Sequence, residues 1–174
     1  MEMRYAYQVE YSIRMIADIP GAYNRMLDAR QELCARAMLD AFYVHIRLLA
    51  DFLIRRTKNL DFGPSDFGVP WQAPNSAEAQ RLSGHWDVAS KYVSHFSRDR
   101  VPSDLDSLNA FPVGATFFVE MARDAIAVVG SFVRALESEL PDSTCQSGPA
   151  TLLRERAVLL RRAYDDACAK LGIV

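Results

Sequence analysis

The residues that follow Pro20-Gly21 carry an apolar stripe that only a helix can present on one side. Their large apolar side chains recur every three or four positions, as a helix with about 3.6 residues per turn requires: Leu39, Phe42, Ile46, Leu49 and Leu53. Ala, Leu, Arg and Met are also abundant there, and all four favour helix. We therefore expect one long helix from the Pro20-Gly21 pair to about Arg56.

The first residues of the chain fit two patterns. Apolar side chains alternate over residues 3–13 as in a strand, whereas Tyr7, Tyr11, Met15 and Ile19 recur at helical spacing. No partner strand is evident elsewhere in the sequence. We therefore favour a helix before Pro20-Gly21.

The rest of the sequence predicts three more helices separated by loops. Residues 57–76 contain three prolines and two glycines, which predicts a long irregular loop. Ser76 then opens a helix as its N-cap, and further helices are expected over about 114–139 and 150–171. The predicted fold class is all-α: an antiparallel bundle of four to five helices in a single domain, residues 1–174, with the Pro/Gly-containing loop after the second helix.

Composition excludes several classes of protein. The formal net charge of −2 arises from mixed acidic and basic residues, without the basic field typical of duplex-binding proteins. The longest uncharged apolar run, residues 125–133, is too short to span a bilayer. Cys34, Cys145 and Cys168 match no disulfide or metal pattern. We expect a cytoplasmic protein that has no cofactor and no contact with a membrane.

One polar cluster lies in the stretch SKYVSHFSRDR, residues 90–100. On a helix, Lys91, His95 and Arg98 fall within a sector of about 60°, beside the apolar Tyr92 and Phe96. A histidine with a neighbouring arginine suits acid–base catalysis on a phosphodiester, because the arginine stabilises an anionic transition state. The alternative is a solvated helix end, where cations are favoured by the negative end of the helix dipole.

The second helix supplies candidate partners for that cluster. Arg47 and Asp51 lie four residues apart on its polar side, a spacing that a surface ion pair also explains. By helical phase His45 falls between Phe42 and Leu49, where a hydrogen-bonded core histidine is the simpler interpretation.

A zinc site is a third hypothesis. The only histidines are His45, His85 and His95, and three imidazoles with a carboxylate such as Asp51 could bind zinc inside a bundle. Their spacing contains no HxxxH or HxxE pair. The hypothesis of a zinc-dependent bundle enzyme therefore ranks below the others.

The segments HIRLLADF (residues 45–52) and KYVSHFSRDR (residues 91–100), with Asp66-Phe67 and Trp71 between them, resemble a group of small, uncharacterised, all-helical bacterial proteins. The pattern of that group runs HxRxLxDF, then KxxxHxxxxR, and the resemblance covers roughly residues 7–100. It implies that six residues form one constellation: His45, Arg47, Asp51, Lys91, His95 and Arg100.

That group is in turn distantly similar to HEPN-domain proteins. These are helical bundles that often act as metal-independent ribonucleases or RNA-binding partners in defence and toxin–antitoxin systems. Their signature is an arginine followed at a short spacing by a histidine. The nearest pair here, Arg81 and His85, is one residue too close, and His95 is preceded by Lys91 instead of an arginine.

The leading hypothesis is a dimeric protein of HEPN-like character that binds or cleaves RNA, with Lys91, His95 and Arg100 as catalytic residues. The supporting residues are Arg47, Asp51, His45 and Arg98. The dimer is expected from apolar residues around Val128 to Val133 that look surplus to one bundle. The expected partners are a second copy, RNA or an antitoxin-like protein. The alternative hypothesis is a non-enzymatic interaction or scaffold bundle.

Overall fold

The chain is all-helical. The structure is a computed structural model, and it describes residues 3–55, 62–94, 115–141 and 147–173. Within these ranges there are five α-helices and no strand, which confirms the predicted fold class. The helices are α1 (Arg4–Asp28), α2 (Glu32–Leu53), α3 (Ala77–Ser94), α4 (Ala115–Ser138) and α5 (Gly148–Leu171), and a short 3-10 helix, η1, spans Pro64–Phe67.

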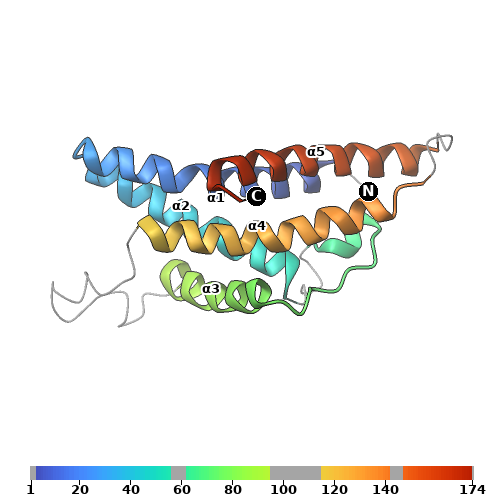
Figure 1. The fold of residues 1–174 in the computed structure, drawn as a ribbon, viewed down its shortest axis with the longest axis horizontal. Coiled ribbons are helices and arrows are strands. Elements are labelled where there is room, and N and C mark those ends of the chain that lie inside the picture. The colour runs from blue at the N-terminus through green and yellow to red at the C-terminus, as the bar shows by residue number, and fades with distance from the viewer. Residues whose placement is uncertain (1–2, 56–61, 95–114, 142–146, 174) are drawn as a thin grey trace.

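Helix α4 is the centre of the bundle. It contacts α1, α2, α3 and α5, and Figure 1 shows it between α5 on one side and α3 on the other. Most of its apolar side chains are buried, and Met121, Ile126 and Phe132 are completely so. A helix that is apolar on most of its surface needs neighbours on most sides, and this explains the central position. The prediction of a central helix over about 114–139 is confirmed.

The boundary predicted at Pro20-Gly21 is wrong. Helix α1 continues through Pro20 to Asp28, and the chain turns only at residues 29–31. Proline in a helix removes a single hydrogen bond. Here the packing of Ile19, Pro20 and Tyr23, all buried, keeps the helix intact. The turn occurs at Arg30, whose φ of 55° is left-handed and ends the helical path.

Helix α1 confirms the helical interpretation of residues 3–13, but with a different buried face. The side chains in the core are those of Ala6, Val9, Ile13 and Ile16, among others, whereas Tyr7 and Tyr11 are 55% and 51% exposed. The tyrosines that suggested helical spacing therefore lie on the outer side of the helix.

The apolar residues that suggested a dimer belong to the core of the single chain. Val128, Val129, Phe132 and Val133 are all at most 1% exposed within one copy. They leave no surplus apolar surface, so the reason for expecting a dimer is removed. No helix in the described part of the chain is both long enough and apolar enough to cross a membrane.

The segment between α2 and α3 is anchored where the structure describes it. The indole Nε1 of Trp71 donates a hydrogen bond to the carbonyl oxygen of Leu53 at 2.8 Å, and Phe67 is buried. Ser76 then caps α3, because its hydroxyl accepts the N–H of Ala79 at 3.2 Å. These contacts fix the start of α3, and with it the side chains that α3 directs at α4.

Candidate functional site

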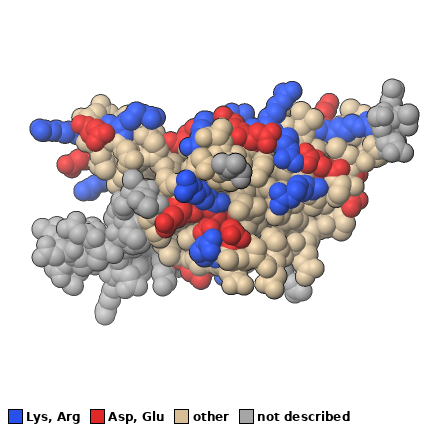
Figure 2. Space-filling model, in the orientation of Figure 1, with Lys and Arg blue, Asp and Glu red and all other residues tan. Residues whose placement is uncertain are grey.

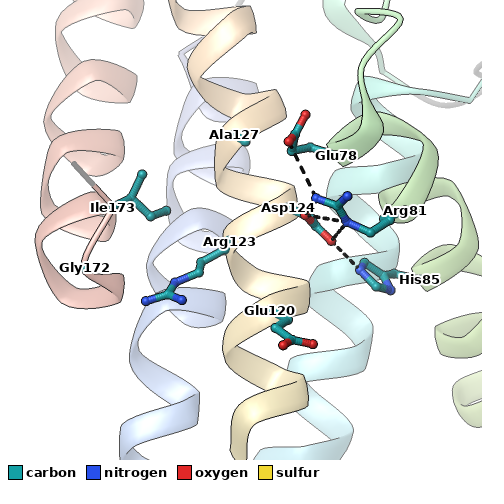
Figure 3. A pocket seen from close by; sticks show the side chains of 9 residues that line it. All are labelled: Glu78, Arg81, His85, Glu120, Arg123, Asp124, Ala127, Gly172 and Ile173. Carbon is teal, nitrogen blue, oxygen red and sulfur yellow. Dashed lines mark hydrogen bonds and ion pairs between the residues drawn. The ribbon is translucent and has the colours of Figure 1, made fainter.

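A pocket of about 690 Å³ opens between α3, α4 and the residues that end α5 (Figure 3). We call it the α3–α4 pocket. Nine residues line it: Glu78, Arg81, His85, Glu120, Arg123, Asp124, Ala127, Gly172 and Ile173. Polar side chains from two helices therefore converge on one solvent-accessible space.

Asp124 is the centre of this arrangement. Its carboxylate accepts hydrogen bonds from Arg81, with Nη2 at 2.7 Å and Nε at 3.0 Å, and lies 2.9 Å from Nε2 of His85. Its side chain is only 8% exposed. A buried carboxylate is costly unless it is paired and hydrogen-bonded, and these two partners from α3 satisfy it.

Helical geometry accounts for the meeting of these side chains. Arg81 and His85 lie four residues apart on α3, so they share one face of that helix. Asp124 has the same phase on α4 as the buried Met121 and Val128, which places its carboxylate at the packed contact with α3. The cluster therefore ties α3 to α4.

The arrangement leaves a reactive atom on His85. A carboxylate can only accept hydrogen bonds, so the contact with Asp124 places the proton of a neutral imidazole on Nε2 and leaves Nδ1 with a lone pair. The hydrogen bonds to Asp124 raise the pKa of Arg81, so its guanidinium is charged. Its Nη1 has no hydrogen bond or ion pair within the described residues, and the side chain is 52% exposed. His85, whose Nδ1 can accept a proton, and the cationic Arg81 thus both belong to the lining of the pocket.

Arg47 and Asp51 lie between α2 and α3 and do not line the α3–α4 pocket. Arg47 Nε is 3.7 Å from Asp51 Oδ2, and Asp51 Oδ1 accepts the indole N–H of Trp86 at 2.7 Å. The guanidinium carbon of Arg55 lies 3.3 Å from the centre of the Trp86 ring. These contacts tie α2 to α3.

His45 is a core residue between α1 and α2. It is buried, its Nδ1 lies 3.1 Å from the hydroxyl oxygen of Ser12, and its ring makes a T-shaped contact with the ring of Tyr11. Burial lowers the pKa of His45 below its usual value. These contacts agree with the interpretation of His45 as a hydrogen-bonded core histidine.

The lowered pKa of His45 predicts that the protein loses stability in mild acid. In the unfolded chain a histidine titrates near ~6.5, so as the pH falls below that value the unfolded state takes up a proton before the folded state does. The free energy of unfolding should therefore decrease between about pH 7.5 and pH 5.5. Urea unfolding across this range should show a shallower dependence for His45→Gln than for the parent. Equal slopes for both proteins would contradict the prediction.

The cluster predicted over residues 90–100 lies largely outside the described residues. His95, Arg98 and Arg100 are not described, and Lys91 lies on α3 in a turn where the structure describes only the backbone. Their roles therefore stay predictions.

The described histidines do not come together. His45 bonds Ser12 between α1 and α2, whereas His85 bonds Asp124 between α3 and α4. Among the described residues, no three His, Cys, Asp or Glu side chains form a group suited to a metal ion.

Asp124 is the site residue that the sequence analysis did not single out. It stands in the apolar run VEMARDAIAVVG, in phase with Met121 and Val128. A charged residue on the buried side of an apolar helix requires a buried partner. The position of Asp124 in the apolar pattern is therefore the sequence feature that indicates a buried polar cluster. The sequence indicates Arg81 and His85 only as a pair that is one residue too close for the HEPN signature.

The fold and the site together define an all-helical protein with a buried carboxylate that holds an arginine and a histidine at a pocket. Neither a family model, nor a curated protein, nor a solved structure matches the sequence. The resemblance to HEPN-domain proteins therefore remains a prediction.

Proposed function

We propose that this protein cleaves RNA without a metal ion, with His85 and Arg81 as the catalytic residues. The observation that carries the proposal is the contact of both side chains with buried Asp124, which fixes them at the pocket in Figure 3. A histidine oriented by a carboxylate, beside a cation, is suited to proton transfer at a centre where negative charge develops.

The chemistry follows from the atoms that remain available. His85 Nδ1 accepts the proton of a ribose 2′-hydroxyl, and the 2′-oxygen attacks the adjacent phosphorus. The bond from phosphorus to the 5′-oxygen breaks, and that oxygen takes a proton from water. The hydroxide left behind removes the proton from His85, which restores the base. Arg81 stabilises the negative charge on the non-bridging oxygens. The products are a 2′,3′-cyclic phosphate and a 5′-hydroxyl end, and DNA is not a substrate because it lacks the 2′-hydroxyl.

Ribonuclease chemistry is also what the HEPN resemblance implies, although that resemblance rests on Lys91, His95 and Arg100 and not on Arg81 and His85. Arg81 and His85 are one residue closer than the HEPN signature, yet a spacing of four places both on one face of α3. Their shared contact with Asp124 shows that the shorter spacing still brings an arginine and a histidine together.

The test is cleavage of labelled total RNA in EDTA by the parent protein and by His85→Ala. Loss of a general base lowers a rate by about 10²–10⁴-fold, and we expect a loss of that size in a variant that melts like the parent. His95→Ala is the matched control, because it tests the predicted cluster at residues 90–100. Undiminished cleavage by a folded His85→Ala would overturn the proposal, and loss in His95→Ala alone would move the site to that cluster.

A second candidate function is protein interaction without catalysis. It is favoured by large apolar side chains on the outer side of α1 and α2, since Tyr7, Tyr11 and Leu48 are each about half exposed. Tyr11 contacts His45, and Leu48 lies one helical turn from His45, so these residues lie on the same side of the bundle. Exposed apolar clusters mark interaction surfaces. No RNA cleavage by the parent protein would favour this function.

A further inference from the structure

A second cavity lies beside the α3–α4 pocket. It has a volume of about 680 Å³ and is formed by residues of α1, α4 and the end of α5. We call it the α1 cavity. It shares Arg123, Gly172 and no other residue with the α3–α4 pocket, so it contains neither of the proposed catalytic residues.

The α1 cavity is cationic, unlike the α3–α4 pocket. Its charged lining residues are Asp18, Arg25, Arg123 and Lys170, which give a net charge of +2. The α3–α4 pocket has three acidic and two arginine side chains in its lining. On the face shown in Figure 2, acidic and basic side chains are mixed, so local groups of cations decide where an anion can bind.

The charge of Arg123 is held in place without being neutralised. Its Nε and Nη2 donate to the carbonyl oxygen of Leu171 at 3.0 and 2.8 Å, and Figure 3 shows the side chain reaching from α4 toward the end of α5. A carbonyl is a neutral partner. The guanidinium therefore keeps its full charge while its orientation is fixed, which lowers the entropic cost of binding an anion.

Arg25 and Lys170 differ in how they are paired. Within the described residues the Arg25 guanidinium makes no hydrogen bond or ion pair, and it lines the cavity from the last turn of α1. Lys170 lies 2.6 Å from Asp18 and 2.8 Å from Asp166. The two arginines thus supply the positive charge that is not offset, whereas the charge of Lys170 is balanced by the two aspartates.

We propose that the α1 cavity binds a phosphate group, with Arg25 and Arg123 as its main partners. The planar guanidinium groups of arginine match the oxygens of a phosphate, and the volume lies within the range of small-molecule sites. The helix dipole alone would explain a basic residue in the last turn of α1. It does not explain why a fixed arginine from α4 lines the same space.

The phosphate has two sources, and each predicts a different outcome. One source is a phosphorylated small molecule that occupies the cavity by itself. The other is the backbone of an RNA strand, because Arg123 lines both cavities and a strand bound at His85 would pass it. The site itself does not depend on RNA cleavage by the protein.

The test measures the binding of two probes, inorganic phosphate and a short single-stranded 2′-O-methyl RNA, which cannot be cleaved by attack of a 2′-oxygen. The proteins are the parent, Arg25→Glu and the control Arg162→Glu. Arg162 is an exposed arginine on α5 that lines neither cavity. We expect Arg25→Glu to weaken binding by about tenfold or more, as loss of a charge-assisted hydrogen bond does, and Arg162→Glu to bind like the parent.

The two probes distinguish the sources. Binding of phosphate but not of RNA, weakened by Arg25→Glu, assigns the cavity to a small molecule. Binding of RNA that Arg25→Glu weakens assigns it to the backbone of a strand. RNA binding that is equally affected by both substitutions, or no binding of either probe by the parent, overturns the proposal. Cleavage lost in His85→Ala together with unaltered binding in Arg25→Glu would overturn this inference and leave the proposed function standing.

Discussion

Replacing Asp124 by alanine is expected to lower the free energy of unfolding by about 1.5–3 kcal/mol, the range for hydrogen bonds to a charged group. The carboxylate is buried and joins Arg81 and His85 across the contact between α3 and α4. Its removal leaves the Nε2–H of His85, which is only 14% exposed, without its acceptor. Urea denaturation of both proteins measures the difference.

Asp87→Ala is the matched control for Asp124→Ala. Asp87, on α3, is likewise an aspartate that pairs with an arginine, but its ion pair with Arg55 is long, at 3.7 Å, and its side chain is 61% exposed. An exposed pair of this kind contributes little, so the control should stay within about 0.5 kcal/mol of the parent. Equal losses for the two variants would mean that the buried cluster does not stabilise the contact between α3 and α4.

Replacing Gly130 by alanine should destabilise the protein by about 1–3 kcal/mol, the usual cost of overpacking a core. Alanine normally favours helix over glycine. At this position of α4, however, an added Cβ would lie 2.7 Å from Cε2 and 2.8 Å from the hydroxyl oxygen of Tyr164 on α5. The ring of Tyr164 would have to leave its place against α4. A lowered melting temperature is the expected result.

Gly84→Ala separates the steric effect from helix propensity. Gly84 lies on α3 with nothing within 4 Å of an added Cβ, so alanine there should stabilise the protein by up to ~1 kcal/mol. Tyr164→Leu provides the second check, because a smaller side chain should remove most of the penalty of Gly130→Ala. Gly130→Ala with the melting temperature of Gly84→Ala would show that the ring yields at no cost.

The sequence predicts those parts of the fold that depend on residues close to one another in the chain. Helix α4 could be recognised because apolar residues occur in nearly every turn. The N-cap at Ser76 could be recognised because its hydroxyl accepts a hydrogen bond from a backbone N–H only three residues further on. The start of α2 could not be recognised. Pro20 is a local signal for a break, and the packing of its neighbours overrides it. Arg30 adopts a left-handed conformation that nothing in its residue type indicates.

The candidate site could not be predicted from sequence patterns, for a different reason. Asp124 is 43 positions from Arg81 and 39 from His85, and no periodicity links residues on different helices. The spacing of Arg81 and His85 could be read from the sequence, but it differs by one residue from the HEPN signature. The meeting of the three side chains depends on how α3 packs on α4, and only the structure supplies that packing.

The contact of α1 with α5 has a consequence for the order in which the molecule can assemble during synthesis. The two helices run side by side in Figure 1, although one is made at the beginning and the other at the end of this sequence. A ribosome releases α1 and α2 long before α5, and the two can pair early as neighbours in the chain. The side of α1 that faces α5 then stays uncovered until the last helix emerges. During that interval the uncovered side of α1 is accessible to chaperones and to other chains.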